Sequence, residues 1–170
     1  GRAVPYRQVL AESLERVAPR EGLDLADEER QALGDSLPTW PPFDEVPSSL
    51  AELRSLGWRI GILSNTDPEF LDASLEAIGV PVDLRITASE AGSYKPAHGH
   101  WERFFEQTGA ERERHAHVAA SLFHDIAPAN ELGLRAVWIN RLRETSDLPR
   151  AAELGDLSKL PETLDDLVGA

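Results

Sequence analysis

Four short, mostly apolar runs of the sequence alternate with segments of helical character. The runs span residues 58–63, 84–87, 117–121 and 136–139. Each is too short to be a helix and is bounded by glycine or polar residues, which is typical of a strand buried in a parallel sheet. Strands that alternate with helices indicate an α/β fold, here a doubly wound parallel sheet with helices on both faces.

The segments between these runs carry start and stop signals for helices. Thr66 and Glu69 have the spacing of a capping box, and Pro68 between them is tolerated in a first helical turn. Glycine favours the position just after the last helical residue. Four glycines follow expected helices in this way: Gly57, Gly79, Gly109 and Gly133. We therefore expect helices over about 48–56, 66–78, 98–108 and 125–132, with a last helix from about Pro161.

The first 43 residues differ from the rest of the chain. Residues 1 to about 37 are amphipathic and helical in pattern, without a strand-like run. Residues 38–42 then hold three prolines, which cannot continue a helix. The expected organisation is a helical unit with its linker over 1–43, followed by an α/β core over 44–170.

Charge and composition exclude several classes of function. Thirty acidic residues face 17 basic ones, for a net charge of -13, so neither nucleic acid nor an anionic membrane is an expected partner. The absence of cysteine excludes disulfides, thiolate metal sites and cysteine nucleophiles. No apolar run approaches the roughly 18 residues of a membrane span, and the first residues lack a signal-peptide pattern. A cytoplasmic setting is expected.

Polar residues stand where the predicted strands end, which is where open α/β sheets bind ligands. They are Ser64 and Asn65, Lys95 in the loop after Thr87, Asp125 in the segment after Val118, and the pair Asn140 and Arg141. Four of them also have an ordinary structural explanation: a turn for Ser64 and Asn65, an exposed side chain for Lys95, and a helix N-cap for Asp125. Five histidines, at positions 98, 100, 115, 117 and 124, match no standard metal-ligand spacing and are expected to be solvated or half-buried.

Four motifs in this order resemble those of the haloacid dehalogenase superfamily. They are ILSNTD at 62–67, GSYKP at 92–96, HVAASLFHD at 117–125 and GLRAVWINR at 133–141. The resemblance covers about 44–141 and is closest to the branch that contains 2-haloacid dehalogenases and capped phosphatases. The helices before it resemble the later part of that family's cap. The implied fold is a Rossmannoid core with a partial helical cap.

The resemblance also implies a chemistry. In this family an aspartate attacks carbon or phosphorus, and water then resolves the covalent intermediate. Ser64 and Asn65 match the residues that bind a small anionic substrate, and Lys95 matches the cation that offsets the developing charge. Asp125 matches the residue that holds Mg²⁺ in phosphatases or positions water in dehalogenases.

The sequence departs from the family at its nucleophile. The family carries that aspartate in an Asp-x-x-x-Thr motif on a strand ahead of the cap, and no such pattern precedes residue 44. That strand is central in the family sheet, between the strands of Ser64 and Val118. We therefore expect an N-terminally incomplete core with two unpaired interior edges, and no turnover by these 170 residues. The sequence does not define the oligomeric state, although an exposed interior edge would favour association, for example as a homo-oligomer.

The fourth motif departs as well. Ala120 stands where phosphatases carry a first acid, so Asp125 alone predicts only a weak Mg²⁺ site. Ala120 and Leu122 replace the serine and asparagine of dehalogenases, and Trp101 replaces their tyrosine. The pattern leans toward metal-independent chemistry. The alternative to a hydrolase is a catalytically dead binding or scaffold module with the same fold, which the pair Ala119 and Ala120 motivates. An upstream strand ending in Asp-x-x-x-Thr would favour the hydrolase.

Overall fold

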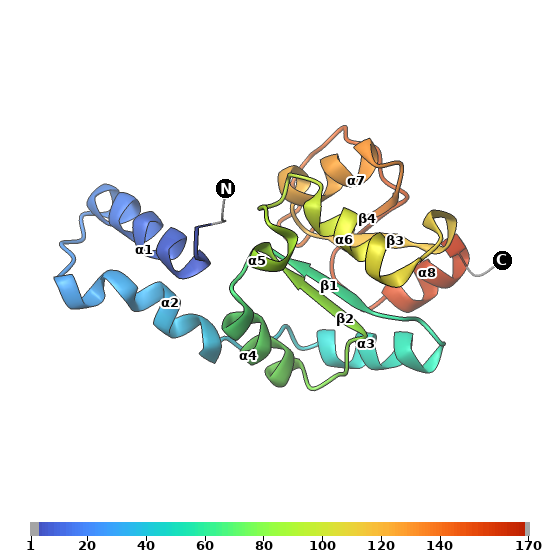
Figure 1. The fold of residues 1–170 in the computed structure, drawn as a ribbon, viewed down its shortest axis with the longest axis horizontal. Helices are drawn as coiled ribbons and strands as arrows, with labels where there is room; N and C mark the ends of the chain where they lie inside the picture. Colours follow the sequence, from blue (N-terminus) through green and yellow to red (C-terminus); the bar gives the residue numbers. More distant parts are fainter. Residues whose placement is uncertain (1–3, 169–170) are drawn as a thin grey trace.

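The computed structural model describes residues 4–168 (Figure 1), and within each of its two sheets the neighbouring strands are parallel. β1 (Gly61–Ser64) pairs with β2 (Leu84–Thr87), while β3 (Ala116–Ala119), β4 (Arg135–Ile139) and β5 (Ala152–Leu154) form a second sheet in that order. The predicted α/β class is therefore confirmed. The first strand begins three residues later than expected and the third ends two residues earlier. The sequence did not predict β5.

Helices cover both faces of the second sheet, as a doubly wound fold requires. Successive residues of a strand point to opposite faces. Val137 and Ile139 of β4 accordingly belong to a core with α3 (Val46–Ser55) and α8 (Leu160–Val168). Trp138, between them, lies in a second core with α6 (Gly99–Thr108) and α7 (Ala127–Glu131). The helices and sheet thus form three layers.

The N-terminal helical segment, residues 4–39, lies to one side of these layers (Figure 1). It is made of consecutive helices: α1 (Tyr6–Val17), η1 (Ala18–Glu21), η2 (Asp27–Gln31), α2 (Ala32–Ser36) and η3 (Leu37–Thr39). The remaining helices are α4 (Pro68–Ile78), α5 (Ala88–Ala91), η4 (Arg112–Arg114) and η5 (Leu122–Ile126). Within residues 4–168 no helix has the length and apolar character needed to cross a bilayer.

Asp67 joins the N-terminal helical segment to the core. Its two carboxylate oxygens accept the main-chain N–H groups of Tyr6, at 2.8 Å, and Arg7, at 2.9 Å. The capping box predicted for Thr66 and Glu69 is wrong, because Asp67 is the N-cap residue of α4 and makes no side-chain cap there. The Thr66 hydroxyl is buried without a partner among the described residues. Asp67 thus stabilises the start of α1 rather than its own helix.

The two sheets do not meet. Among the described strands none is hydrogen-bonded to both, and a cavity of about 930 Å³ is lined by residues 61–63 of β1, by 116–119 of β3 and by His115 just before β3. Residues of α3, α6 and α8 complete its walls. We call this cavity the slot. It separates the strand that ends at Ser64 from the strand that contains Val118.

Candidate active site

The sequence-predicted polar residues gather at the carboxyl edge of the strands that border the slot. Ser64 is the last residue of β1, and Asn65 follows it. Asp125 lies in η5, a π-helical turn that begins three residues after β3. Lys95 comes from the loop between α5 and α6. Lys95 and Asp125 both line the slot.

Lys95 connects the two sheets. Its ammonium donates to the main-chain oxygen of Leu63 in β1, at 2.9 Å, and to Oδ1 of Asp125 beyond β3, at 2.7 Å. Only 10% of the Lys95 side chain and 8% of the Asp125 side chain are exposed. Lys95 is therefore not the ordinary exposed side chain that was its alternative explanation. An ammonium group this buried needs partners, and the Leu63 carbonyl and the Asp125 carboxylate stabilise it at the end of the slot.

Asn65 holds the main chain of Lys95. Its Oδ1 accepts the Lys95 N–H at 2.7 Å, and its Nδ2 donates to the Lys95 carbonyl at 3.1 Å. This two-way contact fixes the lysine loop to the end of β1. Ser64 is held less tightly, since its hydroxyl accepts only the Thr66 N–H, at 3.3 Å. Because the hydroxyl oxygen is the acceptor in this hydrogen bond, its own proton stays available to another acceptor.

Asp125 is not the helix N-cap that the sequence predicted. Ser121 occupies that position, and its hydroxyl accepts the His124 N–H at 3.1 Å. Asp125 instead lies inside the π-helical turn, a type of turn that is frequent at functional sites. Burial would raise the pKa of Asp125, but the hydrogen bond from His117 and the charge and hydrogen bond of Lys95 lower it overall. The carboxyl is therefore ionised at neutral pH.

Two histidines of the site were not predicted from the sequence. His100 and His117 are 0% and 7% exposed, so the expectation that they are solvated or half-buried is wrong. His117 Nε2 lies 3.1 Å from Asp125 Oδ1, and His100 Nε2 donates to the Ser64 carbonyl at 3.0 Å. Burial lowers the pKa of His100, and the hydrogen bond to Ser64 only partly opposes this. A histidine inside an apolar strand, as at 117, is the signal that could have found one of them, because buried polar groups need partners.

Comparisons with known proteins agree on one family. The sequence model of haloacid dehalogenase-like hydrolases matches residues 6–133. The chain belongs to this family. The (S)-2-haloacid dehalogenase of Pseudomonas sp. (strain YL) is 31% identical over 142 residues, which are 82% of this chain and 61% of that protein. The chain thus spans less than two thirds of that relative's length.

A phosphatase and a solved dehalogenase widen the comparison. The glyceraldehyde 3-phosphate phosphatase of Methanothermobacter thermautotrophicus is 27% identical over 72% of this chain and 58% of its own length. The L-2-haloacid dehalogenase of Xanthobacter autotrophicus with chloropropionic acid covalently bound superposes with a TM-score of 0.81. It is 19% identical, and the match covers 94% of this chain and 75% of that one. This structural likeness establishes the haloacid dehalogenase-like fold.

The residues at the strand ends do not fit the Mg²⁺ ion that the family's phosphatases imply. Oδ1 of Asp125 already contacts the Lys95 ammonium and His117, and Ala120 carries no ligand. Within residues 4–168 no cluster of three or more histidine, aspartate or glutamate side chains could hold a metal. Mg²⁺ requires several hard oxygen ligands, and a cation 2.7 Å from the one carboxylate repels a second. The mechanism proposed below therefore contains no metal-dependent step.

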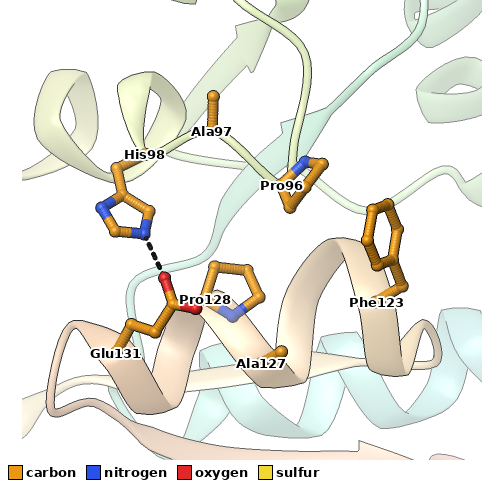
Figure 2. Close-up of a pocket in the computed structure, with 7 residues that line it drawn as sticks. All are labelled: Pro96, Ala97, His98, Phe123, Ala127, Pro128 and Glu131. Atoms are coloured by element: carbon orange, nitrogen blue, oxygen red, sulfur yellow. Dashed lines mark hydrogen bonds and ion pairs between the residues drawn. The ribbon is translucent and has the colours of Figure 1, made fainter.

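A second cavity, of about 470 Å³, lies apart from this constellation. Figure 2 shows residues of the loop after Lys95 facing η5 and α7 across it, with one contact between them, His98 Nε2 to Glu131 Oε2 at 3.0 Å. The lining residues are Pro96, Ala97, His98, Phe123, Ala127, Pro128 and Glu131. None of the four predicted site residues lines this cavity, whereas Lys95 and Asp125 line the slot.

Proposed function

We propose that this chain provides most of the active site of a hydrolase that cleaves a small anionic substrate through an aspartyl ester. A 2-haloacid is the first candidate substrate, because a relative at 31% identity is a (S)-2-haloacid dehalogenase. The observation that carries the proposal is the Lys95 ammonium, bonded to β1 and Asp125 at the mouth of the slot. A buried cation at the carboxyl edge of parallel strands attracts a carboxylate substrate and stabilises developing negative charge.

The nucleophile belongs, in this proposal, to a strand that occupies the slot. β1 and β3 border the slot, and the Lys95 ammonium contacts both the end of β1, at Leu63, and Asp125 beyond β3. A parallel strand between them would hydrogen-bond to both edges and bring its carboxyl end beside Lys95. The 170 residues alone are then expected to lack turnover, and residues 4–39 serve as part of the cap over the substrate.

The reaction balances with these groups. A carboxylate oxygen of the nucleophile forms a bond to C2 of the haloacid while the carbon–halogen bond breaks, and halide leaves with the bonding electrons. Water then adds to the ester carbonyl and the acyl–oxygen bond breaks. One water proton passes to the departing oxygen, which gives a 2-hydroxy acid, and the other is released as the nucleophile returns to its carboxylate form. Ser64 donates to the substrate carboxylate, Lys95 offsets charge, and Asp125 orients the water. Asn65 acts through Lys95, whose loop it holds.

The test compares the 170-residue chain with a version that carries an added N-terminal segment containing an Asp-x-x-x-Thr strand. Halide release from 2-chloropropionate and phosphate release from p-nitrophenyl phosphate are measured for both. We expect halide release from the extended chain alone. Lys95→Ala, or the added Asp changed to Asn, should abolish it.

Each other outcome has a meaning. Release of phosphate without halide would place the protein with the family's phosphatases and overturn the haloacid proposal. Turnover by the unextended chain that Lys95→Ala abolishes would overturn the proposed origin of the nucleophile. A folded extended chain that binds 2-chloropropionate without turnover would favour a binding module, for which Ala119 and Ala120 are the motivating observation.

A further inference from the structure

A line of hydrogen bonds runs from α6 to Asp125. The Trp101 indole N–H donates to His117 Nδ1 at 3.3 Å, and His117 Nε2 lies 3.1 Å from Asp125 Oδ1. The two rings also meet edge to face, with centroids 5.1 Å apart. Trp101 is fully buried, and His117 and Asp125 are 7% and 6% exposed. No water is needed to complete this line, because each donor already has an acceptor.

We infer that Trp101 and His117 are positioning residues that fix the Asp125 carboxylate, so that one oxygen is fully occupied and the other is presented to the slot. The inference rests on the proposed function for the work that Asp125 does. The geometry of the line itself stands without that proposal.

The tautomer of His117 follows from its neighbour. An indole nitrogen can only donate, so the ring nitrogen it faces, Nδ1, must accept. A neutral imidazole then carries its single proton on Nε2, which makes that nitrogen a donor toward Asp125. A proton on Nδ1 would bring two donors face to face in a buried place. Trp101 therefore selects the one tautomer of His117 that can bond the carboxylate.

The consequence for Asp125 is an unequal pair of oxygens. Oδ1 accepts from both His117 and Lys95. Oδ2 receives no hydrogen bond from any group within residues 4–168, and Asp125 lines the slot. The charge of Asp125 also influences the pKa of His100, but His100 donates its hydrogen bond to the Ser64 carbonyl and not to Asp125. Oδ2 is thus the oxygen left to accept a proton from a water molecule beside the substrate.

The departures from the dehalogenase pattern fit this arrangement. Trp101 stands where that pattern carries a tyrosine, and a tyrosine hydroxyl can both donate and accept. Tryptophan only donates, and His117 supplies the acceptor for it. The pair therefore forms a one-way line of donors that ends on Asp125.

The test measures the tautomer and the carboxyl directly in the 170-residue chain, so it needs no turnover. Imidazole ¹⁵N shifts distinguish a protonated from an unprotonated ring nitrogen. We expect His117 to be protonated on Nε2 alone at pH 7. In Trp101→Phe, Nδ1 no longer faces a donor, so a proton on Nδ1 should become detectable beside the one on Nε2, and the added positive charge should lower the Asp125 pKa, read from its carboxyl ¹³C shift. His117→Phe should raise that pKa by about one unit, since it removes one hydrogen bond to a charged group.

Controls separate positioning from packing. Trp138→Phe alters another fully buried tryptophan, whose N–H donates to the Ala120 carbonyl at 3.0 Å, and it should leave both readings unchanged. His117→Gln keeps an N–H donor and should bring the Asp125 pKa part of the way back. If His117→Phe fails to fold, the wild-type tautomer and Trp101→Phe decide the matter. A proton on His117 Nδ1 in the wild type, or a Trp101→Phe variant with both readings unchanged, would overturn the inference.

The inference and the proposed function can fail separately. An extended chain without halide release would overturn the function while leaving the tautomer intact. In an active extended chain, His117→Phe is expected to lower kcat at least tenfold with little change in KM, because the residue acts on the water step and not on substrate binding.

Discussion

β4 and β1 are both short parallel strands, yet they differ sharply in burial. β4 has a neighbour on each side, and its residues from Ala136 to Ile139 are at most 4% exposed. β1 has a neighbour on one side only; Gly61 is exposed, and the three residues after it are half-buried. The contact that β1 lacks, in comparison with β4, is therefore a lateral one with a second neighbouring strand. Helices cover the strands around the slot, but a hydrogen-bonded partner on the slot side is lacking among the described strands.

The largest difference between the two strands should appear in the free energy of unfolding. Trp138→Ala in β4 removes a fully buried side chain and should cost about 3–5 kcal/mol. Ile62→Ala in β1 removes a half-buried side chain at the slot and should cost about 1 kcal/mol. Urea denaturation of both variants gives the comparison. Equal costs would show that the slot wall is packed as tightly as the core.

The ion pair of Lys95 with Asp125, at the mouth of the slot, should contribute nearly as much to the free energy of unfolding. Lys95→Met leaves Asp125 buried without its cation and should cost about 3 kcal/mol at pH 7. Because interactions in the fold lower the Asp125 pKa below its ordinary 3.8, the carboxylate contributes fully above pH 3.8. This contribution is lost as the pH falls through the folded-state pKa. The difference in unfolding free energy between wild type and Lys95→Met should therefore narrow below pH 3.8. A difference that does not change with pH would contradict a stabilising ion pair.

His115 should make the slot sensitive to pH in a different range. Burial, with the nearby His117 and Arg112, lowers the pKa of His115 to about 4 from 6.5. The unfolded chain therefore binds the proton more strongly between these values, and stability should fall as the pH drops from 6.5 to about 4. After a discount for solvent screening, the loss is about 2 kcal/mol. His100, whose pKa is also lowered, adds a loss of the same sign.

His115→Phe isolates the contribution of His115, because phenylalanine can keep the aromatic contacts with Phe104 and Phe105. Denaturation curves of wild type and variant between pH 7 and pH 4 give the difference in stability. That difference should shift in favour of the variant as the pH falls. A difference that stays flat would mean that His115 is solvated.

The smallest effect is expected at the second cavity. The contact of His98 with Glu131 joins side chains that are 35% and 66% exposed, and exposed pairs contribute little. Glu131→Gln should therefore change the unfolding free energy by no more than about 0.5 kcal/mol, and it should not change turnover of the extended chain. A larger loss of turnover would extend the active site to the cavity of Figure 2.

The sequence predicted the helices and strands better than the contacts between them. The apolar runs gave four of the strands, and Gly79 and Gly109 end their helices with left-handed backbone, at φ 69° and 61°, as expected. β5 was missed because it has three residues and Glu153 at its centre. A run this short carries no readable alternation.

The site was predicted in part. Lys95 and Asp125 could be named from their motifs, but not the capping role of Ser121, because an Asp before a helical proline fits an N-cap equally well. The pairing of Trp101 with His117 depends on how a helix lies over a strand 16 residues away. That register is decided by packing and leaves no mark in the local sequence.

Asp67 has a mechanical consequence for the N-terminal helical segment. That segment is attached to the core by several contacts: Asp67 accepts the main-chain N–H groups of Tyr6 and Arg7, the Tyr94 hydroxyl donates to the Val4 carbonyl, and the Arg7 guanidinium lies over the Phe70 ring at 4.9 Å. η3, near the other end of the segment, also packs against α4. Contacts near both ends thus hold the segment beside the core, and the one made by Asp67 lies three residues from Ser64, at the end of β1.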